Sequence, residues 1–168
     1  VRGGGESGEG WPLAGNKLTK PNTWKDFLAC AEYLIAKGYS SPAHLAGESG
    51  SAGGILIGRA IEERPDLFAA AVADVPSADM LRQETTANGV PNTSEFGSTG
   101  TEEGFRGLYA MSSYANVKDG VKYPAVLVTT GINDPRVDPW EPAKFAARLQ
   151  AATASGKPGN PAPDPMST

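Results

Sequence analysis

The sequence predicts an α/β fold in which a mostly parallel β-sheet is covered by helices on both faces. Three short segments are interpreted as strands, two of them apolar, and two of the three longer segments predicted to be helices repeat their apolar residues at helical spacing. Because these segments alternate along the chain, the strands are expected to run parallel, with the helices packed against the sheet. In such sheets, functional groups gather in the loops that follow the carboxyl ends of the strands.

The first helix is predicted to begin at Asn22 or Thr23 and to end at Gly38. Thr23 and Asp26 have the spacing of a capping box, with Asp in place of the usual Glu. Gly38 fits the position just after a helix, where glycine is favoured. The apolar residues in between recur at helical spacing: Phe27, Leu28, Ala31, Leu34 and Ile35.

A strand over His44–Ser49 follows, because this segment is too short for a helix and leads into a glycine-rich turn. A second helix is predicted over Ala52–Arg64 and ends there because Pro65 disfavours helical geometry in the residue before it. Leu67–Val75 is a short apolar run typical of a buried strand, although its alanines fit a buried helical segment as well.

Residues 76–123 are predicted to be irregular, with short helical candidates at Asp79–Gln83 and Glu102–Met111. Ala125–Thr130 is the clearest strand, because it is rich in β-branched residues. Gly131–Val137 is predicted to be a loop.

The last helix is predicted to have Asp138 as its cap and Pro139 at its first position, where a missing N–H costs nothing. Its apolar stripe consists of Pro142, Phe145, Ala146 and Leu149. We therefore divide the chain into a folded part, residues 1–153, and a Pro/Gly-rich tail, residues 154–168, which is predicted to be disordered.

The composition narrows the classes of function. The chain has 168 residues and a net charge of -4, which argues against a nucleic-acid partner. No stretch approaches the roughly 20 apolar residues that span a bilayer, so no membrane partner is expected. The single cysteine, Cys30, excludes an intramolecular disulfide and a zinc site built from several cysteines. We expect no metal and no organic cofactor, and His44 is the single histidine that a mechanism within this chain can use.

A serine in a tight turn is the most informative feature of the sequence. Ser51 lies between the predicted strand and helix, with Ser49 two residues before it and Gly53 two residues after it. This is the G-x-S-x-G pattern of a hydrolase nucleophile with its first glycine replaced by serine, and small residues are needed there because the two backbones nearly touch. The N–H of Ala52 is placed to be an oxyanion donor at the start of the helix. Ser49 fits the pattern less well, and a Gly/Ser-rich loop without chemistry is the alternative.

An acid is expected to follow the serine in chain order, at the end of a later strand. Asp134 comes shortly after the strand Ala125–Thr130, where such an acid belongs, although an aspartate before a proline is also common in turns. Asp74 and Asp79, which follow the preceding strand, are the weaker candidates.

With these pieces placed, the chain resembles the catalytic domain of the prolyl oligopeptidase family of serine peptidases. The resemblance runs from Val1 to about Pro158, and its strength lies in an ordered set of separated motifs. These are Arg2-Gly3-Gly4-Gly5-Glu6 with Gly8 and Trp11; Asn16-Lys17; Ala31-Glu32-Tyr33-Leu34-Ile35 with Gly38-Tyr39 and Ser41-Pro42; Gly50-Ser51-Ala52-Gly53-Gly54; Arg64-Pro65-Asp66-Leu67-Phe68; and Asn133-Asp134-Pro135-Arg136-Val137.

This resemblance implies a partial α/β-hydrolase fold that lacks its first strands and its last strand. It also implies acyl transfer through a Ser–His–Asp triad, with Ser51 as nucleophile and Asp134 as acid, acting on short peptides admitted by a β-propeller domain that is missing here. Arg136 matches an arginine that holds a carbonyl of the substrate main chain, unless it forms a structural ion pair. The stretch from Asn133 to Pro142 resembles the oligopeptidase B branch as much as the prolyl branch.

Two positions bear on which peptide is cleaved. Where the prolyl branch has a tryptophan that stacks on a substrate proline, this sequence has Asn92. Oligopeptidase B uses acidic residues to hold Lys or Arg, and Glu95 is the acidic residue in reach by sequence. The compartment does not follow from the residues, and a cytoplasmic location is favoured over a periplasmic one.

The triad histidine of the family lies downstream of the stretch matched here. His44 begins the predicted strand, on the order of 15 Å at ~3.3 Å per residue from the strand-to-helix turn around Ser51, which we call the elbow. His44 therefore lies at the opposite edge of the sheet. Without a base, Ser51 is a weak nucleophile. We therefore expect a piece of a serine oligopeptidase that is inactive alone. The alternative is a degenerate hydrolase-like domain that serves as a non-catalytic binding module.

Overall fold

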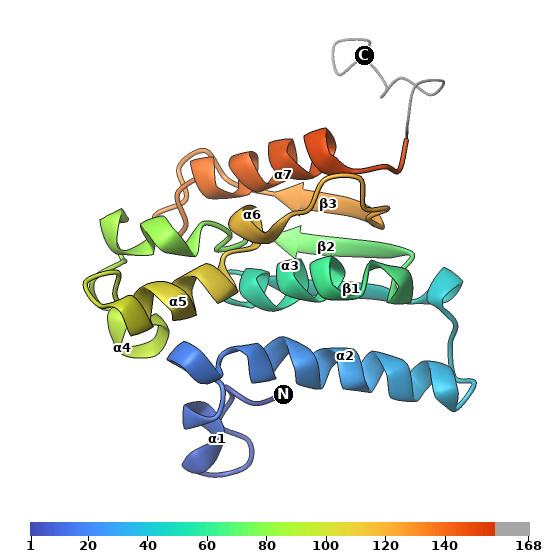
Figure 1. Cartoon of the computed structure of the whole chain (residues 1–168), viewed down its shortest axis with the longest axis horizontal. Helices are drawn as coiled ribbons and strands as arrows, with labels where there is room; N and C mark the ends of the chain where they lie inside the picture. Colours follow the sequence, from blue (N-terminus) through green and yellow to red (C-terminus); the bar gives the residue numbers. More distant parts are fainter. Residues whose placement is uncertain (157–168) are drawn as a thin grey trace.

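The computed structural model describes residues 1–156, in which three strands form one parallel sheet with the order β1–β2–β3 (Figure 1). The strands are β1 (Ala46–Gly50), β2 (Ala70–Asp74) and β3 (Ala125–Thr129). Gly47 of β1 is in register with Ala71 of β2, which is in register with Val126 of β3. The α/β class and the parallel sheet are thus confirmed. The last residue of each strand differs by one position from the predicted last residue.

The helices are α1 (Gly10–Leu13), α2 (Pro21–Ala36), α3 (Gly53–Glu63), α4 (Thr93–Phe96), α5 (Glu102–Met111), α6 (Ser113–Asn116) and α7 (Trp140–Ala152). Short 3₁₀ turns lie at Lys17–Thr19, Pro42–His44, Pro65–Leu67 and Met80–Thr85. The predicted helix Glu102–Met111 has the bounds of α5. The sequence does not predict α1, α4 and α6, because a helix of one turn shows no apolar period. Among residues 1–156, none of the helices combines the length and the apolarity needed to cross a membrane.

Within the described part of the chain, the helices cover one face of the sheet. The helices α2, α3, α6 and α7 follow one another in contact, and α3 and α7 lie against the strands (Figure 1). Gly47, Ala71 and Ala73 on this face are buried. On the opposite face Leu127 is 59% exposed, and Glu48 is exposed as well. The expectation of helices on both faces is therefore met on one face only in residues 1–156, because no segment among them crosses the other face.

The core lies between the sheet and these helices, with α3 at its centre. Ile55, Ile57 and Ile61 of α3 are almost fully buried. Trp24 of α2 and Phe145 of α7 are buried against the same cluster. Burial of each side chain of this size stabilises the folded chain by on the order of 2 kcal/mol. The core therefore holds α3, and the elbow at its start, in a fixed position.

The start of α2 differs from the predicted capping box. The helix begins at Pro21, and Thr23 lies inside it, where its Oγ1 donates a hydrogen bond to the carbonyl oxygen of Arg2 at 2.8 Å. Asp26 accepts hydrogen bonds from the backbone N–H and the guanidinium of the same Arg2. Both side chains thus hold the N-terminal segment onto α2, a contact that local sequence spacing does not reveal. The predicted end is confirmed, because Gly38 follows the helix with a φ of +72°.

The start of α7 and the expected tail also differ slightly from prediction. The helix begins at Trp140, so Pro139 occupies the cap position in place of Asp138. The expected tail begins at residue 154, but the N–H of Ala154 donates to the carbonyl oxygen of Val121, and Ser155 Oγ donates to that of Tyr123. Residues 157–168, the rest of the expected tail, lie outside the described residues.

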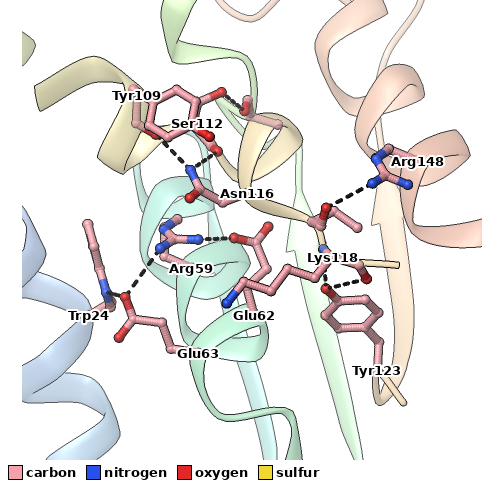
Figure 2. Close-up of polar contacts among 12 residues, drawn as sticks. Trp24, Arg59, Glu62, Glu63, Tyr109, Ser112, Asn116, Lys118, Tyr123 and Arg148 are labelled. Carbon is pink, nitrogen blue, oxygen red and sulfur yellow. Dashed lines mark hydrogen bonds and ion pairs between the residues drawn. The ribbon is translucent and has the colours of Figure 1, made fainter. Parts of the chain in front are cut away.

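A group of charged side chains is buried between α3 and its neighbours (Figure 2). Arg59 pairs with Glu62 and Glu63, and its guanidinium lies 5.4 Å from the ring centre of Trp24. Burial raises the pKa of Glu62 to about 8 and outweighs the opposite effect of Arg59. This group lies at the carboxyl end of α3, away from Ser51, so it acts on folding rather than on the site.

Candidate active site

Ser51 lies at the turn between β1 and α3, at the carboxyl end of the sheet. Its φ is +54°, in the left-handed region that non-glycine residues rarely adopt. This conformation costs a serine on the order of 1 kcal/mol, which surrounding contacts must supply. Ser51 is exposed, as a residue that meets a substrate must be.

Small residues allow the strand and helix to approach closely around Ser51. A Cβ atom on Gly53 would lie 2.1 Å from Ser49 Oγ, and a Cβ atom on Gly54 would lie 2.3 Å from Cβ of Pro76. Ser49 therefore packs toward the start of α3, whereas Ser51 is exposed. This difference favours Ser51 over Ser49 as the reactive residue of the turn.

The backbone of Ser51 is held by the segment that follows β2. The N–H of Ser51 donates to the carbonyl oxygen of Asp74 at 2.9 Å, and the N–H of Ser77 donates to the carbonyl oxygen of Ser51 at 3.0 Å. Val75 in the same segment has a φ of +41°, and its N–H donates to the carbonyl oxygen of Thr129 at 3.0 Å. The turn over residues 74–79, which we call the β2 turn, thus connects the elbow to β3.

Ala52 is the cap residue of α3, and its N–H belongs to the positive end of that helix. Among residues 1–156, this N–H donates no hydrogen bond to a protein acceptor. A cavity of about 220 Å³ is lined by Ala52, Gly53 and the segment Arg2–Gly4, whereas Ser51 is not among its lining residues. The elbow therefore offers a backbone donor that no acceptor in residues 1–156 uses.

Asp134 lies in the loop after β3, at the same edge of the sheet as Ser51. Its Oδ1 accepts hydrogen bonds from the N–H groups of Arg136 at 2.8 Å and Val137 at 3.0 Å. The hydrogen bonds from Val137 and Arg136 lower the pKa of the Asp134 carboxyl, so it is ionised at neutral pH. The two bonds converge on one oxygen and leave Oδ2 for another partner.

The two weaker candidates for the acid have other partners. Asp74 accepts a hydrogen bond from Thr129 Oγ1. Asp79 is buried and pairs with Lys144, and Arg82 lies 3.9 Å from it. Asp134 thus differs from the other two aspartates: its partners are backbone N–H groups, whereas theirs are side chains.

Arg136 is exposed and forms none of the salt bridges found in residues 1–156, although its charge adds to the lowering of the pKa of Asp134. The ion pair considered as an alternative is thus absent from the described part of the chain. The backbone around it is fixed instead: Asn88 Nδ2 donates to the carbonyl oxygen of Pro135 at 2.8 Å. This contact joins the loop after β3 to the segment that contains Asn92.

Asn92 and Glu95 lie at the short helix α4, Asn92 as its cap residue and Glu95 inside it. Glu95 Oε1 accepts a hydrogen bond from Lys20 Nζ at 2.7 Å. The Lys20 side chain is 8% exposed, and its ammonium lies 5.2 Å from the ring centre of Phe96. Much of the negative charge of Glu95 is therefore already compensated. Sequence reasoning missed this contact, because Lys20 and Glu95 are 75 residues apart.

His44 lies in the 3₁₀ turn before β1, at the end of the strand opposite to Ser51. Its Nδ1 is hydrogen bonded with Ser41 Oγ at 2.9 Å. The structure therefore does not bring His44 to the elbow. In the described residues there is also no group of three or more His, Cys, Asp and Glu side chains that would hold a metal ion.

Glu141, on the first turn of α7, is a buried polar residue near the site that sequence reasoning missed. It is 1% exposed and accepts hydrogen bonds from the N–H groups of Ala78 and Asp79 in the β2 turn. An acid in the first turn of a helix is ordinarily explained by the helix dipole, so no sequence signal marks this one as buried.

A cavity of about 550 Å³ lies away from Ser51 along the outer edge of β3. It is lined by Tyr123 and Pro124 just before β3, by residues 125–128 of β3, and by Ala146, Leu149 and Gln150 of α7. In the described residues β3 has a strand neighbour on one side only, so this groove follows an unpaired strand edge.

A parallel sheet, a serine at positive φ directly after a strand, and a helix that starts behind it together define the class of α/β hydrolases. A family model described as the prolyl oligopeptidase family matches residues 1–161, and this chain belongs to that family.

Individual relatives agree with this assignment. The chain is 42% identical to a prolyl endopeptidase of Dictyostelium discoideum over 89% of its length, and 41% identical to Protease 2 of Moraxella lacunata over 90%. The solved structure of oligopeptidase B from Leishmania major matches 93% of the chain with a TM-score of 0.89 and 35% identity. The chain spans 20% and 22% of the length of the first two proteins and 22% of the third. It therefore corresponds to a fragment of such proteins.

Proposed function

We propose that this chain is the part of a serine peptidase that carries the nucleophile and the acid of a Ser–His–Asp triad. The reaction is hydrolysis of peptide bonds in short peptides by acyl transfer. The observation that carries the proposal is the conformation of Ser51, whose positive φ holds it in an exposed turn between β1 and α3. A turn without chemistry has no need for a strained serine, because glycine adopts this conformation without cost.

In this reaction Ser51 Oγ attacks the carbonyl carbon of the substrate and gives its proton to a histidine. The Ala52 N–H donates to the oxygen that becomes negative, at the start of α3, where the helix dipole adds to the stabilisation. The leaving amine takes the proton from the histidine, and water then releases the acyl group by the same steps in reverse. Asp134, ionised and fixed by two backbone N–H groups, orients the histidine and stabilises its charged form.

The histidine is proposed to come from outside this chain, since His44 lies at the wrong end of β1. The chain by itself is therefore expected to be inactive, because a serine hydroxyl without a base is a weak nucleophile. We propose that the longer protein also includes a β-propeller domain, which admits only short peptides.

Arg136, Asn92 and Glu95 are proposed to contact the peptide. Arg136 is exposed and has no carboxylate partner in residues 1–156, so its guanidinium is free to bind a main-chain carbonyl oxygen. Glu95 is already paired with Lys20, so we expect it to contribute a polar contact without imposing a strong preference for Lys or Arg.

A degenerate hydrolase domain that only binds a partner is the second candidate, and the position of His44 is the observation that favours it. The coding sequence beyond Thr168 separates the two. A reading frame that continues into an apolar strand and a His-Gly pair supports the peptidase, whereas a natural stop codon directly after Thr168 supports the binding module.

The activity test compares the longer protein with the chain of 168 residues on a set of short peptides. The longer protein is expected to hydrolyse at least one peptide, and the Ser51→Ala variant is expected to lose about 10⁴-fold or more in kcat. Ser41→Ala is the control, because Ser41 lies with His44 at the opposite end of β1. Undiminished hydrolysis by the Ser51→Ala variant would refute the proposal.

A further inference from the structure

The buried carboxylate of Glu141 connects the two halves of the candidate site. Its Oε2 accepts hydrogen bonds from the N–H groups of Ala78 at 3.1 Å and Asp79 at 3.2 Å. Glu141 lies on α7, directly after the loop that contains Asp134. The residues that it holds belong to the β2 turn, which reaches Ser51.

The β2 turn is held from several sides, and each contact bears on the elbow. Ser77, next to Ala78, donates its N–H to the carbonyl oxygen of Ser51. The carbonyl oxygen of Ala78 accepts from Ser112 Oγ at 3.2 Å and from the N–H of Tyr114 at 3.0 Å. A shift of Ala78 would therefore move the hydrogen bond that fixes the strained backbone of Ser51.

The charged neighbours of Glu141 come from the β2 turn and from the start of α7. Asp79, from the β2 turn, and Asp138, just before α7, are the acidic neighbours. Lys144 of the same helix is paired with Asp79, and Arg82 lies 3.9 Å from that aspartate. Burial raises the pKa of Glu141 to about 7, the two backbone hydrogen bonds oppose this, and the two aspartates add to it. Burying a carboxylate in this position costs free energy. The two hydrogen bonds from backbone N–H groups of the β2 turn offset part of this cost.

We propose that Glu141 is a positioning residue, which holds the β2 turn in the place where Ser77 fixes the backbone of Ser51 and which joins this turn to the helix behind Asp134. Its effect on catalysis rests on the proposed function, but its effect on the elbow backbone does not. It acts through the β2 turn and does not touch the substrate.

The first test measures amide hydrogen exchange in the chain as it exists. In the Glu141→Ala variant at pH 5, the amides of Ser77, Ala78 and Asp79 are expected to exchange at least tenfold faster, since two hydrogen bonds to one acceptor are lost. In Glu141→Gln a side-chain oxygen still accepts, so exchange at pH 5 stays within about threefold of the wild type. The matched control is Glu103→Ala, another first-turn glutamate, which is exposed.

The pH profile separates positioning by this carboxyl from general packing. The pKa of Glu141 is raised in the folded chain, so the arrangement is most stable when the group is protonated and loosens as pH rises from roughly 4.5 to 7. After correction for intrinsic exchange, protection of the Ala78 and Asp79 amides should fall over this range in the wild type. It should stay constant in Glu141→Gln.

Amides in the core of α3, such as that of Ile57, report global stability. If they accelerate in Glu141→Ala as much as the amides of the β2 turn do, the variant is merely unstable and the proposal is wrong. Unchanged exchange of Ala78 and Asp79 in this variant overturns it as well.

The second test measures the rate at which a fluorophosphonate labels Ser51 in the longer protein. Glu141→Ala is expected to slow labelling by about ten- to a hundredfold, and Glu141→Gln is expected to restore most of it, because a small displacement of a nucleophile has effects of this size. A wild-type labelling rate in Glu141→Ala overturns the catalytic part of the proposal. If Ser51 of the wild-type longer protein is not labelled at all, the proposed function fails, while the exchange result still decides whether Glu141 holds the elbow.

Discussion

The N–H of Ser77 donates a hydrogen bond of 3.0 Å to the carbonyl oxygen of Ser51. Ser51 has a φ that a serine rarely adopts, so its conformation depends on contacts from outside the turn. Ser77 and Asp74 supply two of these contacts through the backbone. The candidate nucleophile is thus fixed by the end of β2, the strand between β1 and β3.

Gly54→Ala is expected to destabilise the chain by about 1–3 kcal/mol, although alanine favours helices. The added Cβ would lie 2.3 Å from Cβ and 2.4 Å from Cα of Pro76, so α3 and the β2 turn must move apart. Gly10→Ala is the control, because Gly10 is also helical and a Cβ atom added there would meet no heavy atom within 4 Å. Urea unfolding measures both, and equal stabilities of the two variants would contradict the close approach.

Glu95→Gln is expected to destabilise the chain by about 1–2 kcal/mol, because it leaves the ammonium of Lys20 buried without its charged partner. The double variant Lys20→Met, Glu95→Gln should regain part of this loss, and a double-mutant cycle gives the coupling. The control Glu102→Gln, which breaks the exposed pair with Arg106, should change stability by less than about 0.5 kcal/mol. Strictly additive effects of the Lys20 and Glu95 changes would show that the pair contributes nothing.

The ion pair between Lys20 and Glu95 also predicts that the charge of Glu95 has little effect on which peptides are cleaved. In the longer protein, Glu95→Gln should change the ratio of kcat/KM for basic over neutral peptides by less than about threefold, which corresponds to under 1 kcal/mol. A much larger loss for basic peptides would mean that Glu95 binds Lys or Arg directly despite its contact with Lys20.

Glu62 should make the stability of the chain depend on pH. Burial raises its folded pKa to about 8, so it contributes most at low pH and its contribution is lost as pH rises from roughly 4.5 to 8. The difference in unfolding free energy between the wild type and Glu62→Gln is expected to change over this range, with a slope of at most about 1.4 kcal/mol per pH unit. Glu103→Gln, at an exposed position, serves as control. A difference that stays constant from pH 5 to 8 would show that Glu62 keeps its usual pKa.

Asp134→Asn tests the acid. In the longer protein this variant is expected to lower kcat by about 10⁴-fold, because the amide cannot stabilise the charged histidine. Asp119→Asn is the control, since Asp119 is exposed and pairs with Arg148 far from the elbow. Full activity of the Asp134→Asn variant would transfer the role to another acid, with Asp74 and Asp79 as the remaining candidates.

The sequence was sufficient to predict those parts of the fold whose cause is local. The three strands, the helices α2, α3, α5 and α7, and the turn at Ser51 follow from apolar periods and small residues that lie close together in the chain. The contacts from Lys20 to Glu95 and from Glu141 to Ala78 and Asp79 join residues 62 to 75 positions apart, and no local pattern encodes them. The uncovered face of the sheet could not be predicted either, because alternation of strands and helices does not say on which face each helix packs.

The central claim is that Ser51 is a nucleophile that requires a histidine from outside this chain. The most direct measurement is fluorophosphonate labelling followed by mapping of the modified residue by mass spectrometry. The label is expected on Ser51 of the longer protein, with loss in Ser51→Ala and retention in Ser49→Ala. Ser51 of the chain of 168 residues should remain unlabelled under the same conditions. Strong labelling of Ser51 in the chain alone, or a label on a different residue of the longer protein, would contradict the account.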